Sequence, residues 1–152
     1  DLSSHEAILE RQLKPEARVD VIQEMADLGL KPTSMIDVSD GLASEALHLS
    51  TASGHGIRLY EEKLPIAQQT YETARAFNLD PTMCMLSGGE DYELLFTISQ
   101  DDYDKVHNHP KLTVIGHMVE DPAERKLVTK NGLHVDLTAQ GWDGLRAEKG
   151  QE

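Results

Sequence analysis

The chain has 152 residues, the usual size of one globular domain, and 39% of them are hydrophobic, which is enough for a single core. A net charge of −13 argues against non-specific binding to nucleic acid or to an anionic membrane surface, because both need a basic protein surface. The single cysteine, Cys84, excludes an intrachain disulfide, as expected for a cytoplasmic protein, and no apolar run approaches the roughly 20 residues of a membrane span.

The N-terminal part of the chain is polar and then becomes periodic. Residues 1–14 are interpreted as a linker or an incoming segment, and because Asp1 is not methionine we expect a piece of a longer protein. Apolar residues at helical spacing after Pro15 predict a helix that ends near Gly29. Residues 34–38 are predicted to form a short buried strand.

Helices and strands then alternate through the first two thirds of the chain, and a hairpin follows. Helices are predicted over residues 42–53, after Pro65 and after Ser99, with a turn over 78–82. Strands are predicted at 57–60, 92–98 and 112–117. The strongest hairpin signal is Asn131-Gly132, between strands at 126–129 and 133–137. The pattern predicts an α/β (α+β) single domain with a mixed β-sheet packed by helices.

Two carboxylates three residues apart follow the predicted strand at 34–38. Asp37 and Ser39 project to the same side of an extended segment, and Asp40 lies at the bend into the next helix. One interpretation is a site for Mg²⁺ and phosphate, since carboxylates suit the cation and helix N-terminal N–H groups suit the anion. The alternative is that Ser39 or Asp40 caps the helix. Asp37 favours the first interpretation, because a carboxylate at the end of a buried strand is costly unless it is paired or metal-bound.

A second motif, Ser87-Gly88-Gly89-Glu90-Asp91-Tyr92-Glu93-Leu94-Leu95-Phe96, leads into the predicted strand at 92–98. Its glycines allow the backbone to approach a ligand closely. Strand alternation places Leu94 and Phe96 on one face and Leu95 on the other. Glu90, at the start of the strand, is the acid freest to face a pocket. A tight turn with solvated acids is the alternative, and the spacing alone favours that alternative.

Trp142 is the only tryptophan and lies in a turn-like segment near the C-terminus. Its ring could stack on an aromatic or cationic ligand, or it could anchor the core. The seven histidines show no metal-binding spacing, and Cys84 is interpreted as a small buried hydrophobe. The chain contains neither a GxxxxGK[ST] phosphate loop nor a GxGxxG fingerprint.

Taken together, the motifs resemble those of the C-terminal domain of the thiamine-monophosphate kinase family. That family lies within the ATP-binding superfamily that includes aminoimidazole ribonucleotide synthetase and selenophosphate synthetase. The resemblance runs from about Lys14 to Leu145, nearly the whole chain. It is carried by residues 35–43, 62–65, 87–96 and 141–143.

The resemblance implies a kinase that transfers the γ-phosphoryl group of ATP to thiamine monophosphate, giving thiamine diphosphate with the help of Mg²⁺. By position, Asp37 and Asp40 resemble Mg²⁺ ligands, and Ser39 resembles an ATP contact. Glu90 resembles a contact to the thiamine moiety, and Trp142 resembles the ring that packs against it. No general base is expected, because the accepting phosphate oxygen is already ionised.

The enzymes of that family have two domains, and the resemblance covers only the second. Residues 15–145 are therefore expected to be the C-terminal kinase domain and residues 146–152 a polar tail. An N-terminal ATP- and metal-binding domain and a homodimer are expected for the full-length protein, and the domain alone is expected to be nearly inactive. Two alternatives stay open, namely a non-catalytic ligand-binding domain of the same fold and a sister ATP-dependent synthetase of the superfamily.

Overall fold

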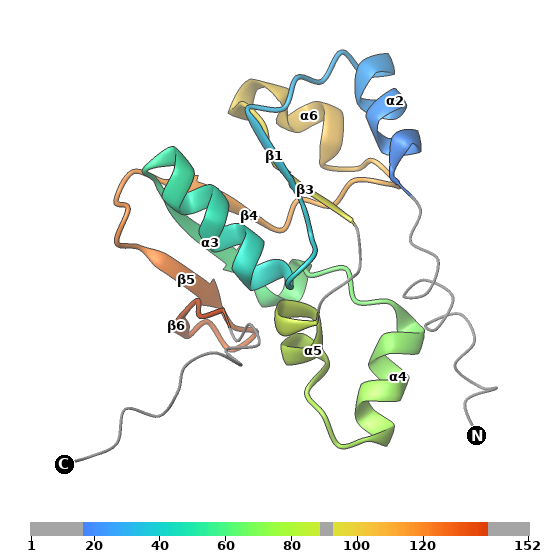
Figure 1. The fold of residues 1–152 in the computed structure, drawn as a ribbon, viewed down its shortest axis with the longest axis vertical. Coiled ribbons are helices and arrows are strands. Elements are labelled where there is room, and N and C mark those ends of the chain that lie inside the picture. The colour runs from blue at the N-terminus through green and yellow to red at the C-terminus, as the bar shows by residue number, and fades with distance from the viewer. Residues whose placement is uncertain (1–16, 89–92, 140–152) are drawn as a thin grey trace.

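Two β-sheets, one of two strands and one of four, carry the fold (Figure 1). The computed structural model describes residues 17–88 and 93–139. In the smaller sheet, β1 (Ser34–Asp37) pairs antiparallel with β3 (Leu94–Thr97), so that Asp37 lies opposite Leu94. Because of this pairing, Val38, the residue after β1, lies beside Glu93, the residue before β3.

The larger sheet has the strand order β4-β2-β5-β6. Its strands are β2 (Gly56–Tyr60), β4 (Gly116–Val119), β5 (Arg125–Val128) and β6 (His134–Asp136). β2 runs antiparallel to β4 and parallel to β5, while β6 returns antiparallel to β5. This arrangement confirms the mixed sheet and the α/β (α+β) class predicted from the sequence.

Helices cover these sheets and connect them. They are α2 (Val19–Asp27), α3 (Leu42–Ser53), α4 (Gln68–Ala76), α5 (Pro81–Ser87) and α6 (Tyr103–Val106), with 3₁₀ turns η2 (Glu61–Lys63) and η3 (Gln100–Asp102). Figure 1 shows α3 lying along the larger sheet and α2 and α6 gathered at the far end of the β1–β3 pair. Among the described residues, no helix is long and apolar enough to cross a membrane.

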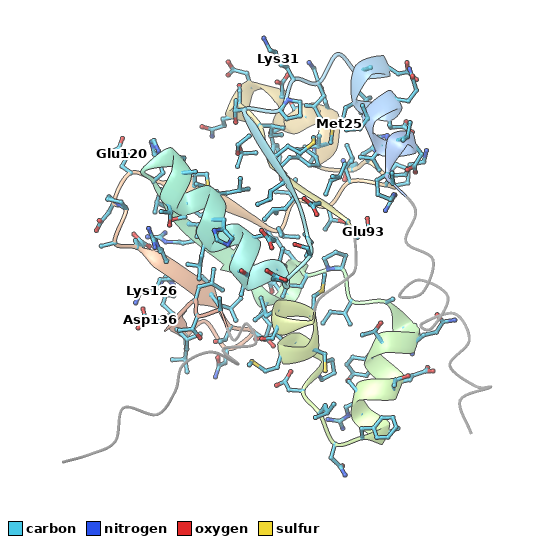
Figure 2. The ribbon with its side chains drawn as sticks, in the orientation of Figure 1. Met25, Lys31, Glu93, Glu120, Lys126 and Asp136 are labelled. Carbon is cyan, nitrogen blue, oxygen red and sulfur yellow. The ribbon has the colours of Figure 1, made fainter. Side chains whose placement is uncertain are left out.

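Two hydrophobic clusters form the core, and β3 contributes to both. The first comprises Val38, Leu42, Ala43, Ala46, Ile57, Leu59, Leu64, Leu86, Leu127 and Leu137, and Leu95 packs against it. The second comprises Val21, Met25, Leu30, Val106 and Leu112, and Leu94 and Phe96 pack against it (Met25 is labelled in Figure 2). The predicted alternation of Leu94, Leu95 and Phe96 is therefore confirmed, and it places β3 between the clusters.

Several predicted elements are confirmed. The helix predicted over residues 42–53 matches α3, and Gly54 ends it in the left-handed conformation with a φ of 68°. β2 also lies where it was predicted, and the hairpin of β5 and β6 turns at Gly132, whose φ is 80°. Ser99 accepts a hydrogen bond from the N–H group of Asp101, as expected for a helix cap.

Other predictions about the elements are wrong in their limits or their burial. The turn predicted over 78–82 contains the start of α5, because the Asp80 side chain caps that helix and Pro81 occupies its first turn. The strand predicted over 112–117 begins only at Gly116, since Leu112 belongs to the second cluster instead. α2 begins at Val19, and Pro15 lies outside the described residues. β1 is not a buried strand, because its side chains alternate between half-buried and exposed.

An ion pair connects the two parallel strands of the larger sheet. Arg58 on β2 pairs with Glu124, the residue before β5, and the N–H group of Ile57 donates to the carbonyl of Glu124 at 2.7 Å. The hydrogen bond from Arg58 lowers the pKa of Glu124 below its ordinary value of 4.5, against the opposing effect of burial. Stability from this pair is therefore present above the ordinary value and is lost as the pH falls through the lowered pKa.

We expect Glu124→Gln to make the loss of stability in acid less steep, because the variant has no carboxylate to protonate at this position. The measurement is the urea midpoint of unfolding from neutral pH down to about pH 2. Arg58→Met should change the slope in the same way, and the double variant should add little to either single change. A wild-type slope in Glu124→Gln would show that the pair contributes no pH-dependent stability.

Candidate functional site

The segment between β1 and α3 turns sharply and presents its polar side chains outward. Asp37 and Asp40 are exposed, Ser39 is half-buried, and Val38 between them is buried in the first cluster. The turn closes at Gly41, which has a φ of 102° and a ψ of 149°, a conformation used almost only by glycine. Two carboxylates and one hydroxyl therefore stand together at the N-terminus of α3.

Neither Ser39 nor Asp40 caps α3, so the capping alternative is wrong. The N-cap residue is Gly41, and no side chain of the described residues accepts a hydrogen bond from the first turn of the helix. The argument from the cost of burying Asp37 is also wrong, because that side chain is exposed at the end of β1. The interpretation as a ligand site now depends on how the exposed groups are arranged and not on the cost of burial.

Glu45, which the sequence analysis did not identify as a site residue, forms hydrogen bonds with the turn from its buried side. It lies in the first turn of α3, is only 3% exposed and sits among the apolar side chains of the first cluster. Its Oε1 accepts a hydrogen bond from Ser39 Oγ at 3.4 Å and another from the N–H group of Asp40 at 3.3 Å. The signal that could have identified it is an acidic residue on the buried face of a helix, between Leu42 and Leu49.

The second motif lies against this turn at two points. A Cβ atom added to Gly41 would stand 2.8 Å from the carbonyl oxygen of Leu86 and 3.1 Å from Cα of Ser87, so the two backbones touch. The N–H group of Val38 donates to the carbonyl of Glu93 at 2.8 Å, which continues the β1–β3 pairing. The fold thus brings together the two motifs on which the sequence prediction depends.

Two of the predicted substrate contacts cannot be placed. Glu90 and Trp142 both lie outside the described residues. Glu93 lies within the second motif and is labelled in Figure 2; it is half-buried and pairs with Arg18, the residue before α2. Arg18 also bonds Asp20 at 3.1 Å, so this cation is already shared between two carboxylates.

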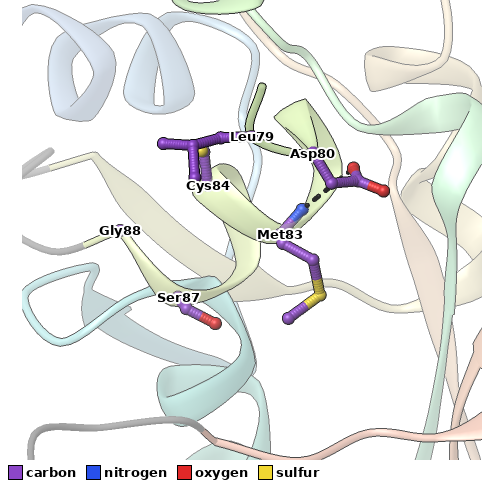
Figure 3. Close-up of a pocket in the computed structure, with 6 residues that line it drawn as sticks. All are labelled: Leu79, Asp80, Met83, Cys84, Ser87 and Gly88. Carbon is purple, nitrogen blue, oxygen red and sulfur yellow. Dashed lines mark hydrogen bonds between the residues drawn. The ribbon is translucent and has the colours of Figure 1, made fainter. Parts of the chain in front are cut away.

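A mainly apolar pocket of about 330 Å³ opens beside the second motif (Figure 3). Its lining residues are Leu79, Asp80, Met83, Cys84, Ser87 and Gly88. The Asp80 carboxylate is engaged in capping α5, and Cys84 is half-buried where burial was predicted. Ser87 Oγ is buried and has no hydrogen-bond partner within the described part of the chain. Such a lining suits an uncharged ring better than a phosphate group.

The turn after β1 fits a Mg²⁺ ion as part of a coordination shell. Asp37, Ser39 and Asp40 all offer oxygen atoms, which Mg²⁺ prefers, and the ion usually keeps waters and substrate phosphates as its other ligands. Within residues 17–88 and 93–139, no group of three or more His, Cys, Asp or Glu side chains could hold a metal ion alone. The oxygen atoms of the turn would therefore supply only part of the coordination shell of such an ion.

Comparison with known protein families gives one match over most of the chain. Residues 2–128 match the family described as AIR synthase related protein, C-terminal domain. Among curated relatives, the thiamine-monophosphate kinase of Methanopyrus kandleri is 34% identical over 124 residues, which are 82% of this chain and 38% of the relative. The thiamine-monophosphate kinase of Escherichia coli K12 is 32% identical over 151 residues, 94% of this chain and 44% of the relative. The chain thus spans less than half of the length of either relative.

Solved structures give the same picture of the fold. AaThiL complexed with AMPPCP and TMP superimposes with a TM-score of 0.72 at 30% identity, covering 90% of this chain and 40% of that one. Escherichia coli HypE, a hydrogenase maturation protein, gives a TM-score of 0.61 at 22% identity over 79% of this chain and 39% of that one. The likeness to HypE concerns the fold alone.

We expect Gly41→Ala to destabilise the chain more than Gly54→Ala. Alanine at Gly54, whose φ is 68°, costs roughly 1–2 kcal/mol of backbone strain, and alanine at Gly41 costs more, because a φ of 102° with a ψ of 149° is used almost only by glycine. Only at Gly41 does the added methyl group also meet backbone, since nothing lies within 4 Å of it at Gly54. Urea unfolding of the two variants measures the difference, which should reach about 1–3 kcal/mol. Equal losses would show that Gly41 does not hold the two motifs together.

Proposed function

The chain belongs to the C-terminal domain family of AIR synthase related proteins, and from this premise we propose that it is the C-terminal domain of an ATP- and Mg²⁺-dependent kinase. Its reaction is the phosphorylation of thiamine monophosphate to thiamine diphosphate. The observation that carries the proposal is the contact between the turn after β1 and the second motif, made through Gly41 and through Val38. Relatives with that activity, at 32% and 34% identity, support the choice of substrate.

The exposed groups of the turn have the roles that this chemistry needs. Asp37 and Asp40 would hold Mg²⁺, and Ser39 would contact the nucleotide. Within residues 17–88 and 93–139, the first-turn N–H groups of α3 have no side-chain acceptor, so they are suited to a phosphate oxygen beside the cation. Bound there, Mg²⁺ supplies screening of the charge that builds up between two anionic phosphates.

The chain itself contributes position and electrostatics, and no proton transfer is required of it. The phosphate oxygen that attacks is already ionised, so the site needs no general base. What the residues must do is hold two anions in line against their repulsion, which is severe beside a chain of net charge −13. The fixed contact between the two motifs supplies that rigidity.

The thiamine moiety would lie on the side of the second motif. Glu90 is the proposed contact to thiamine, and Trp142 would place its ring against the thiazolium cation. The apolar pocket whose lining includes Ser87 and Gly88, the latter two residues before Glu90 in the sequence, would suit an uncharged ring.

The rest of the active site is proposed to come from a preceding domain. The curated relatives are more than twice as long as the part this chain matches. An N-terminal domain would supply further metal ligands, the remaining nucleotide pocket and the contacts of a homodimer. The 152-residue chain alone should therefore bind ATP and thiamine monophosphate weakly and turn over little. Activity of this chain equal to that of the full-length gene product would show that the N-terminal domain is not needed for catalysis.

We expect Asp37→Asn and Asp40→Asn each to lower kcat by at least about a hundredfold in the full-length gene product, because each removes a charged Mg²⁺ ligand. The assay follows formation of thiamine diphosphate from thiamine monophosphate and ATP at several Mg²⁺ concentrations. Asp104→Asn is the matched control, since that side chain is 94% exposed on α6 and lies on the second cluster's side of the fold. Full Mg²⁺-dependent activity in both variants would exclude the metal-binding role of this turn.

A further inference from the structure

Glu45 is the buried carboxylate of the described chain, and the proposed reaction assigns it no part. Three polar residues are buried there, and the other two, Ser50 and Thr82, are neutral. We propose that Glu45 is a positioning residue that fixes the direction of the Ser39 hydroxyl and so makes this turn a cation-binding surface. The inference rests on the proposed function and deepens it.

Burial of the Glu45 side chain lowers the stability of the fold. Burying a carboxylate is expensive unless a cation or several strong hydrogen bonds compensate it. Among the described residues, no basic side chain forms an ion pair with Glu45, and its two hydrogen bonds are long, at 3.4 and 3.3 Å. The partial positive charge at the N-terminus of α3 offsets part of the cost. An apolar side chain would suit the first cluster better, so the charge is not explained by packing.

The chemistry of the contact explains what the charge does. A carboxylate has no proton to donate, so the Ser39 hydroxyl and the Asp40 N–H group must both donate to it. Ser39 then has only lone pairs left to present to a ligand. The Asp40 N–H group is likewise occupied and cannot bind a phosphate oxygen.

The outward-facing side chains of the turn therefore offer only acceptor atoms. These are the carboxylates of Asp37 and Asp40 and the lone pairs of Ser39, a set that attracts a cation and repels a free phosphate. Ser39 would accordingly meet the nucleotide through the bound cation, and the N-terminus of α3 would receive the phosphate oxygen. Glu45 would thus direct the cation to the turn and the phosphate to the N-terminus of α3, although it touches neither ligand.

Glutamine is the informative replacement for Glu45. It has nearly the same shape and can still accept a hydrogen bond, so a role limited to supporting α3 would tolerate it. Its amide group can also donate to Ser39 Oγ, which would occupy a lone pair that the carboxylate leaves free. Removing a buried charge without a counter-cation should not reduce stability.

The test compares wild type, Glu45→Gln, Ser39→Ala and the double variant in the full-length gene product. We expect Glu45→Gln to raise the Mg²⁺ concentration for half-maximal activity by about tenfold, with an unchanged or higher melting temperature. The double variant should be no worse than Ser39→Ala, because Glu45 acts through Ser39. The matched control is Glu120→Gln, an exposed acid in the turn after β4 (Figure 2).

A second measurement does not depend on catalysis. With Mn²⁺ as a paramagnetic probe, wild type should show broadened amide signals for residues 37–41, and Glu45→Gln should need about tenfold more Mn²⁺ for the same effect. Equal broadening in the two proteins, or additive effects of the two substitutions, would overturn the positioning role. A lower melting temperature with unchanged metal dependence would assign Glu45 to fold stability alone. Wild-type broadening without kinase activity would instead overturn the proposed function and leave this inference standing.

Discussion

The contact between the backbone at Gly41 and the end of α5 is the constraint on which the rest of the site depends. No residue with a Cβ atom fits there, because the carbonyl oxygen of Leu86 would be 2.8 Å away. Two segments that are far apart in the sequence thereby become one surface. The antiparallel pairing of β1 with β3 joins the strand that precedes the turn to the strand in which the second motif ends.

The arrangement of the turn would allow an acidic chain to bind an anionic ligand. The carboxylates of the turn face outward, where a divalent cation can reach them, while the helix behind them begins with N–H groups that no side chain of the described residues satisfies. One part of the turn therefore suits a cation, and the neighbouring start of α3 suits an anion. The buried carboxylate of Glu45 lies where those parts meet, and it is the polar group whose presence the core does not explain.

Much of this could be predicted from the sequence, and the exceptions have physical causes. α3 and the hairpin of β5 and β6 have strong local signals, because a glycine with positive φ marks the end of one and the turn of the other. The start of α5 was missed, since Asp80 and Pro81 suit a turn and a helix start equally well. The place of Leu112 is set by contacts with α2, which no local pattern reveals. Glu45 was missed for a similar reason, because its importance depends on what surrounds it.

The connectivity of the larger sheet has a consequence for how the chain acquires its structure. β2 is an interior strand, yet both of its neighbours, β4 and β5, lie more than fifty residues further along the chain. Contacts between such distant segments form late, since the loop between them must be closed first. During synthesis β2 therefore emerges from the ribosome long before either neighbour exists, with apolar Ile57 and Leu59 still uncovered. We infer that this strand joins the core only after the residues that follow β4 have been synthesised.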